Sequence, residues 1–107
     1  AILDKFRREK QVPVAVTEFG VNRWSPGAER FLDDQMGLFE QLRFNAILWH
    51  WPSTHRPYET VHNNHNYFYG PDPASKDEVP DSATGRVIQS YWARNVLRPS
   101  KVRFPTP

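Results

Sequence analysis

Residues 12–20 of the chain read VPVAVTEFG, and this stretch decides the fold class. The run is rich in β-branched residues, is apolar on both faces until Glu18, and is closed by Gly20. Such runs are typical of a buried strand in a parallel sheet, because helices cover both faces of that kind of sheet. Pro13 is tolerated near the start of a strand, where its missing N–H does least damage. The sequence therefore predicts a strand over 12–19.

The ten residues before this strand have the pattern of an amphipathic helix. Ile2, Leu3 and Phe6 recur at helical spacing, and the sequence Gln-Val-Pro at 11–13 ends the helix. The chain begins in the middle of this helix, with neither Met nor a signal peptide at its start. We therefore expect a piece of a longer protein, whose localisation stays open; secretion of the intact parent is compatible with this.

A helix and a second strand are predicted to follow. Ser25 can cap the helix, Pro26 suits its first position, and the helix runs to about Arg43. Gly37 inside it predicts close packing against a neighbour. Residues 44–51 (FNAILWHW) are a second short apolar run, so strand, helix and strand form a predicted βαβ unit with parallel strands. The apolar stripe of the helix consists of Phe31, Leu32, Met36, Leu38, Phe39 and Leu42.

Residues 52–80 are a long proline-rich stretch that also carries aromatic residues and histidines. Connections of this length are usually functional or disordered, and the aromatic residues favour an ordered, functional loop on the active-site side. A last helix is predicted to begin at Asp81 or Ser82, and 98–107 form an extended tail.

The composition indicates one small unit, 1–107, and excludes several classes of protein. Aromatic residues make up 14% of the chain, which argues against disorder. The net charge of +2 comes from interspersed charges, so we expect neither a nucleic-acid partner nor a membrane partner. No apolar run has the roughly 20 residues of a membrane helix. Cysteine is absent, which excludes disulfides and thiolate chemistry, and we expect no cofactor.

Glu18 is the most informative polar residue. Alternation along the strand places it on one face with Val14 and Val16, at the carboxyl end of the strand. In barrels built from βα units, residues at this end form the active site. The alternative is a structural carboxylate that binds a loop or pairs with Arg23, and the spacing alone leaves both interpretations open.

Tryptophans accompany both strand ends. Trp49 and Trp51 share one face at the end of the second run, and Trp24 lies in the loop after the first. An indole ring offers its apolar face to a sugar ring and its N–H to a hydroxyl, so these residues favour carbohydrate binding. Trp49 could instead pack in the core, whereas Trp51 borders the turn at Pro52.

Together these residues resemble glycoside hydrolase family 5, the cellulase family of clan A. The segments VAVTEFG (14–20) and AILWHWPS (46–53), with the helix between them, are similar to the last two strands of its catalytic barrel. The last helix with Trp92 and Asn95, followed by Arg-Pro-Ser at 98–100, also resembles the end of such domains. The resemblance covers nearly the whole chain. It implies an α/β fold that supplies about the last two βα units of a (β/α)8 TIM barrel.

The resemblance also implies roles for individual residues. Glu18 matches the catalytic nucleophile on strand seven, and Trp51 matches the floor under the sugar at the cleavage point on strand eight. Trp24, Asn22 and the 52–80 loop would contact further sugars, and Trp49 belongs to the same Trp-His-Trp motif. The implied activity is endoglucanase-like, retaining hydrolysis of a β-linked polysaccharide.

The chain departs from the family pattern at the general acid/base. In the family this Glu lies in an Asn-Glu dipeptide on strand four, and none of the six Asn residues here is followed by Glu. Retaining hydrolysis needs two carboxyl groups about 5–5.5 Å apart. We therefore expect the isolated chain to be inactive, with Glu59 the one alternative acid within it.

Two other functions stay open. The aromatic residues could serve a non-catalytic or degenerate carbohydrate-binding barrel. Alternatively, His62 and His65 could form a metal-binding module, although zinc would need further ligands.

The predicted two-stranded sheet also needs a partner, because it would have two open edges and because parallel sheets are covered on both faces. We expect the missing amino-terminal part of the barrel, or self-association, to cover its inner face, and a lone monomer to be unstable or to aggregate. That inner face consists of Val12, Val14, Val16, Ile47 and Trp49.

Overall fold

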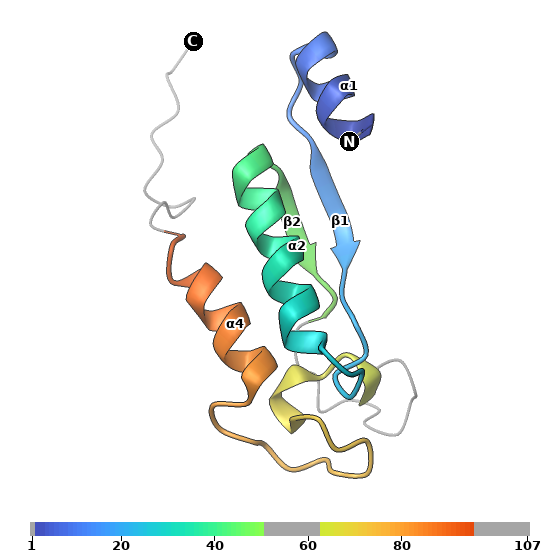
Figure 1. Ribbon diagram of the computed structural model, residues 1–107, viewed down its shortest axis with the longest axis vertical. Coiled ribbons are helices and arrows are strands. Elements are labelled where there is room, and N and C mark those ends of the chain that lie inside the picture. Colours follow the sequence, from blue (N-terminus) through green and yellow to red (C-terminus); the bar gives the residue numbers. More distant parts are fainter. Residues whose placement is uncertain (1, 51–62, 96–107) are drawn as a thin grey trace, which may run out of the picture.

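The structure is a computed structural model that describes residues 2–50 and 63–95 (Figure 1). Over these residues the chain has a small mixed α/β fold, and the predicted order of strand, helix and strand is confirmed. The elements in chain order are α1 (Ile2–Lys10), β1 (Ala15–Phe19), α2 (Ala28–Leu42), β2 (Asn45–Leu48), the 3-10 helix η1 (Tyr67–Tyr69) and α4 (Ala83–Trp92).

The two strands pair in parallel, with Ala15 beside Asn45 and Phe19 beside Leu48. Both are shorter than predicted, because each is a strand only where the other lies beside it. The N–H of Asn45 donates to the carbonyl of Val14 at 3.0 Å, and the N–H of Trp49 donates to that of Phe19 at 2.7 Å. These bonds mark the two ends of the pairing, and the peptide bond after Trp49 is cis.

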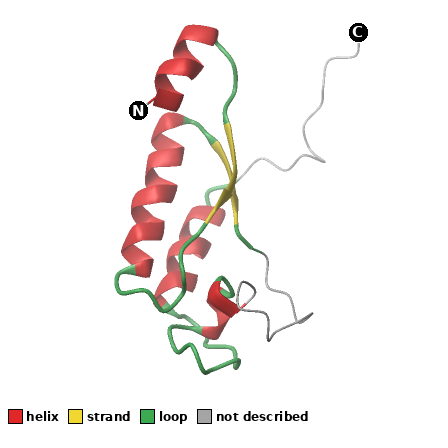
Figure 2. Cartoon of the chain, turned by 90° about the vertical axis from the view of Figure 1, so that its right-hand side faces the viewer, coloured by secondary structure: helices red, strands yellow, loops and turns green. Residues whose placement is uncertain are grey.

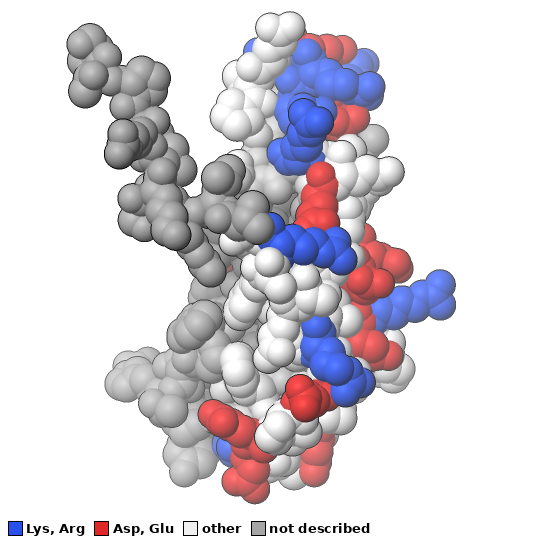
Figure 3. All heavy atoms as spheres, turned by 90° about the vertical axis from the view of Figure 1, so that its left-hand side faces the viewer, with Lys and Arg blue, Asp and Glu red and all other residues white. Residues whose placement is uncertain are grey.

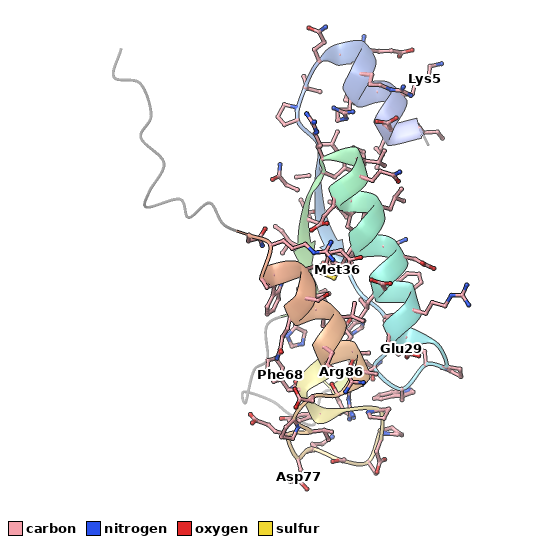
Figure 4. The ribbon with its side chains drawn as sticks, turned by 60° about the vertical axis from the view of Figure 1, so that its left-hand side comes forward. Lys5, Glu29, Met36, Phe68, Asp77 and Arg86 are labelled. Atoms are coloured by element: carbon pink, nitrogen blue, oxygen red, sulfur yellow. The ribbon has the colours of Figure 1, made fainter. Side chains whose placement is uncertain are left out.

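Helices α2 and α4 run side by side along one side of the sheet (Figures 1 and 2). Met36 points from α2 toward α4 and the strands (Figure 4). Tyr91 of α4 lies so close to α2 that a β-carbon on Gly37 would be 3.0 Å from its hydroxyl oxygen, which confirms the predicted close packing at Gly37. The buried apolar core is formed by Leu32, Met36, Tyr67, Ile88 and Tyr91.

The predicted apolar stripe of α2 is too wide. Leu32 and Met36 are buried, and Phe39 packs edge-on against Phe19 of β1 with ring centroids 5.0 Å apart. Phe31 and Leu38 flank this line and are 44% and 42% exposed. One sheet face and one neighbouring helix cover only the central line of the stripe.

The predicted start of the last helix, at Asp81 or Ser82, is confirmed. Ser82 begins α4, where its hydroxyl oxygen accepts the N–H of Gly85 at 3.1 Å. The predicted cap of α2 at Ser25 is wrong, since α2 begins at Ala28 after Gly27 in the left-handed region (φ 76°). The carbonyl of Ser25 accepts the N–H of Ala28 instead, so Ser25 belongs to a turn that precedes the helix.

The side of the sheet that faces away from α2 and α4 is exposed, as the sequence predicts (Figure 2). Ile47 is 59% and Trp49 37% exposed on this side. The apolar residues of α1 are exposed as well, and Ile2 reaches 87%. The fold therefore has a well-packed helical side and an open side.

The surface carries charges of both signs. On the face that Figure 3 shows, Lys and Arg side chains lie among Asp and Glu side chains along the length of the molecule. On α1, for example, Lys5 pairs with Glu9 at 3.7 Å and Arg8 pairs with Asp4 at 3.0 Å. Within residues 2–50 and 63–95, no helix has both the length and the apolar character to cross a membrane.

Candidate active site

A hollow at the carboxyl ends of the two strands brings together residues from three parts of the chain. Glu18 and Gly20 come from the end of β1, Trp49 from the end of β2, and His65 from the loop before η1. Phe19 completes the lining of the hollow. Parallel strands end at the same edge of a sheet, which is why residues 31 positions apart, Glu18 and Trp49, share this place.

Glu18 and Trp49 form the part of the hollow that sequence analysis predicted. Glu18 is exposed at the end of β1, and Trp49 keeps 37% of its surface open to solvent. Among the described residues, Trp49 is therefore not part of the buried core. A carboxylate beside an accessible indole ring can bind a ring with hydroxyl groups and an apolar face, with the carboxylate near the edge of that ring.

The other predicted sugar-binding residues lie elsewhere. Asn22 and Trp24 follow β1, where the carbonyl of Asn22 accepts the N–H of Ser25 at 2.9 Å. The Trp24 ring lies 5.2 Å from the guanidinium of Arg23 and is not part of the lining of the hollow. Trp51 lies outside the described residues. The structure thus joins Glu18 with Trp49 and separates them from Asn22 and Trp24.

Arg23 is the anchor of the loop that follows η1, and its partners exclude the alternative in which it pairs with Glu18. Only 1% of its surface is exposed. Its Nε donates to the carbonyl of Asn63 at 2.8 Å, and its terminal nitrogens donate to those of Asp72 at 2.7 Å and Ser75 at 2.9 Å. Burial lowers the pKa of Arg23, and Asp72 and Tyr69 raise it in part. A guanidinium remains charged after such a change, so one cation orders the loop.

Tyr67 connects this loop to both strand ends. Its hydroxyl oxygen accepts the N–H of Val21 at 2.9 Å, and the carbonyls of Val21 (3.0 Å) and Trp49 (3.3 Å) are acceptors for its proton. Only 3% of Tyr67 is exposed, and burial raises the pKa of its phenol, partly offset by the bond from Val21. The neutral phenol is thus the form that the fold requires.

Residues 63–80 are ordered in the way the sequence predicts, and they bring His65 to the hollow. A β-carbon on Gly20 would be 3.1 Å from Cδ2 of His65, so the imidazole lies against the end of β1. The sequence indicated His65 only as part of a possible metal site with His62, which lies outside the described residues. Across 2–50 and 63–95, no group of three or more His, Asp or Glu side chains could hold a metal ion.

Arg23 and Tyr67 are the important residues that sequence analysis did not assign to the site. Arg23 appeared only as a possible partner of Glu18, and Tyr67 only as one aromatic residue of a long loop. The available signal was an Arg three residues after a strand-end Gly, together with a later loop too aromatic to be disordered. That signal does not predict that Arg23 binds the carbonyls of residues 40 to 52 positions later in the sequence.

A second cavity of about 260 Å³ lies on the helix side of β2. Leu48, Ile88 and Trp92 contribute much of its apolar wall, and Glu78 and Gln89 add polar groups. Pockets with apolar walls are common ligand sites. This cavity nevertheless borders the core residues Tyr67 and Ile88 and lies on the opposite side of β2 from Trp49, so it is separate from the Glu18 hollow.

Two acids of α2 already have other partners. Asp33 Oδ1 accepts the hydroxyl of Tyr91 at 2.8 Å, and Glu40 pairs with Arg94 at 2.7 Å. Both are on the helix side of the sheet, away from the hollow. Among the described residues, Glu18 is therefore the one carboxylate that lines the hollow.

The chain matches no protein-family model, no curated protein and no solved structure.

Proposed function

We propose that this chain is the carboxyl-terminal part of a (β/α)8-barrel glycoside hydrolase that cleaves β-linked polysaccharide with retention, and that Glu18 is its nucleophile. The observation that carries the proposal is the meeting of Glu18 and Trp49 at the carboxyl ends of two adjacent parallel strands. Active sites of βα barrels are built at this end of the strands. The resemblance of 14–20 and 46–53 to the last two strands of family 5 barrels supports the same assignment.

In the proposed reaction, this chain supplies the nucleophile and another part of the barrel supplies the acid/base. The carboxylate of Glu18 attacks the anomeric carbon, and the bond from that carbon to the leaving oxygen breaks. A second carboxyl group gives the leaving oxygen its proton and later removes one from the water that hydrolyses the glycosyl ester. No second carboxylate lines the hollow among the described residues, so we expect the acid/base on another polypeptide segment; Glu59 lies outside the described residues.

The exposed apolar residues on the open side of the fold support the proposal that a partner covers this side. Val12, Ile47 and Trp49 are 39%, 59% and 37% exposed, and the apolar face of α1 is exposed too. Burying side chains of this size stabilises a protein by roughly 1.5–3 kcal/mol each. We propose that the other strands of the barrel, or a second copy of the chain, cover this side.

Covalent labelling tests the nucleophile without needing the acid/base. A 2-deoxy-2-fluoro-β-glucoside with a dinitrophenolate leaving group requires no proton to depart, because the leaving anion is already stable. Attack by Glu18 would form a glycosyl ester and release dinitrophenolate with the bonding electron pair. Intact-protein and peptide mass spectrometry should locate the added fluoroglucosyl group on the peptide that contains Glu18.

Matched variants make the labelling specific. Glu18→Gln should abolish the adduct, whereas Glu29→Gln should leave it unchanged, since Glu29 is an exposed carboxylate in the first turn of α2. Binding of cello-oligosaccharide without any adduct would favour the alternative of a non-catalytic carbohydrate-binding barrel. Labelling that persists in Glu18→Gln would remove Glu18 from its proposed role.

The intact parent offers the complementary test. There Glu18→Ala should abolish turnover of an aryl β-glycoside, and added azide should restore part of it by attacking in place of the carboxylate. Trp51→Ala should raise the barrier by about 1–3 kcal/mol if the indole holds the sugar at the cleavage point. A parent enzyme indifferent to Glu18 would contradict the proposal.

A further inference from the structure

Among residues 2–50 and 63–95, few hydrogen bonds join the two strand ends that form the hollow. The last backbone bond between them in this part of the chain runs from the N–H of Trp49 to the carbonyl of Phe19. Beyond it, the hydroxyl of Tyr67 bridges Val21, which follows β1, and the carbonyl of Trp49, which follows β2. The Tyr67 phenol therefore lies between the two strand ends that carry Glu18 and Trp49.

The space around the bridge is tight. A β-carbon on Gly20 would be only 2.8 Å from the Tyr67 hydroxyl oxygen and 2.8 Å from the Trp49 carbonyl oxygen. Real β-carbons essentially never make contacts this short, so the absence of a side chain at Gly20 lets the two strand ends and the phenol meet. The hydroxyl thus fills the junction and binds both sides of it.

Tyr67 is itself held from the helix side of the molecule. Its ring belongs to the buried core, and its carbonyl accepts the hydroxyl of Ser82 at 3.2 Å. Asn63, four residues before it, is bound by Arg23 through both its carbonyl and its side-chain oxygen. The position of the phenol is therefore fixed by the loop and by α4, independently of the bonds between the strands.

We propose that Tyr67 is a positioning residue of the Glu18 site: its hydroxyl sets the separation of the two strand ends, and so the placement of the Trp49 ring relative to the Glu18 carboxylate. This inference rests on the proposed function for its effect on chemistry, while its effect on geometry can be measured separately. Misplacement of reacting groups by about 1 Å can lower a rate by about 100-fold.

Tyr67→Phe and Tyr91→Phe form a matched pair. Each removes one hydroxyl that has hydrogen-bond partners, but the Tyr91 hydroxyl joins α4 to Asp33 of α2 on the helix side, away from the hollow. In the fluoroglucoside labelling, Tyr67→Phe should lower the rate constant at saturating reagent by about 10- to 100-fold. Tyr91→Phe should change it by less than about twofold, because a general loss of stability does not alter the reaction of the molecules that stay folded.

A second readout does not depend on sugar chemistry. In protein labelled with 5-fluorotryptophan, the fluorine resonance of residue 49, assigned with Trp49→Phe, should move in Tyr67→Phe and stay in place in Tyr91→Phe. If it stays in place in both variants, the positioning role is overturned whatever the labelling shows. If it moves only in Tyr67→Phe but the unmodified chain forms no adduct, the positioning role holds and the glycosidase function fails. Equal labelling rates in all three proteins would overturn the proposed effect on the reaction.

Discussion

At the carboxyl ends of β1 and β2, the buried side chains of Arg23 and Tyr67 bind backbone groups of the loop and of both strand ends. At the amino ends of the strands, Val12 is 39% exposed and α1 has no buried residue. One end of the sheet thus contains its own supporting contacts, and the other presents apolar surface that a neighbour could bury. The candidate site lies at the supported end.

The contrast shows how one chain can hold an ordered site on an incomplete sheet. Positioning of the Glu18 hollow depends on contacts within 18–23 and 63–82, which the chain supplies itself. Stability of the sheet as a whole depends on a face that it leaves open. If the two ends are independent, a substitution at one end should leave the other unchanged.

Arg23→Met should have the largest effect. It leaves several carbonyls of the loop without their donor, and we expect the free energy of unfolding to fall by about 3–5 kcal/mol. Urea denaturation at one fixed protein concentration measures this loss. Arg30→Met, at an exposed position of α2, should cost about 0.5 kcal/mol or less. Equal effects of the two substitutions would contradict the role of Arg23 as an anchor.

Alkaline pH should destabilise the supported end through Tyr67. Burial raises its pKa above the unfolded value of 10.0, so the folded chain holds this proton more tightly than the unfolded chain does. The resulting stabilisation is complete below pH 10 and is lost as the pH rises toward the folded pKa. Denaturation curves between pH 8 and 11 should therefore show a decline that is smaller in Tyr67→Phe. An unchanged pH dependence in that variant would contradict the assignment.

Ser82→Ala and Ser25→Ala compare a real helix cap with an apparent one. Ser82 caps α4 and also donates to the carbonyl of Tyr67, so its loss should cost about 1 kcal/mol. Ser25 makes no cap bond to α2, and its loss should cost about 0.5 kcal/mol or less. Thermal unfolding of both variants under identical conditions measures the difference. A larger loss of stability in Ser25→Ala than in Ser82→Ala would instead support the helix cap that the sequence predicts at Ser25.

Ile47→Asn should have the smallest effect on an isolated chain. Its side chain is 59% exposed on the open face, so we expect a change of about 0.5 kcal/mol or less in the monomer. If a second copy covers this face, the same substitution should shift the association equilibrium toward monomer. Light scattering over a range of concentrations detects that shift. A stable monomer that unfolds cooperatively and is indifferent to Ile47→Asn would argue against any partner on the open face.

Local patterns in the sequence predicted the features that depend on local interactions. Glu18 and Trp49 were placed at the same edge because parallel strands end together, and the start of the last helix was predicted at Asp81 or Ser82 because these residue types commonly precede helices. Gly37 was predicted to make a close contact for a similarly local reason. Glycine is unfavourable inside a helix, so its presence there indicates close packing.

The features that escaped prediction depend on distant pairing. The strand bounds were set by the partner strand, as the bond from Asn45 to Val14 shows. The role of Arg23 depends on acceptors as far away as Ser75, and that of Tyr67 on two strand ends that precede it. Ser25 had the residue type of a cap, but the helix begins two residues later than predicted, after the left-handed Gly27. No local sequence pattern predicts contacts between residues that lie so far apart in the sequence.

The choice of acceptors by Arg23 has a consequence for how the loop can change. Apart from the side-chain oxygen of Asn63, the guanidinium binds main-chain carbonyls, including those of Asp72 and Ser75. Every amino acid presents the same carbonyl, so most side chains between 69 and 75 can be exchanged without removing the anchor. The loop beside the hollow can therefore acquire new surface chemistry over evolution, or in the hands of an engineer, while the path of its backbone is preserved.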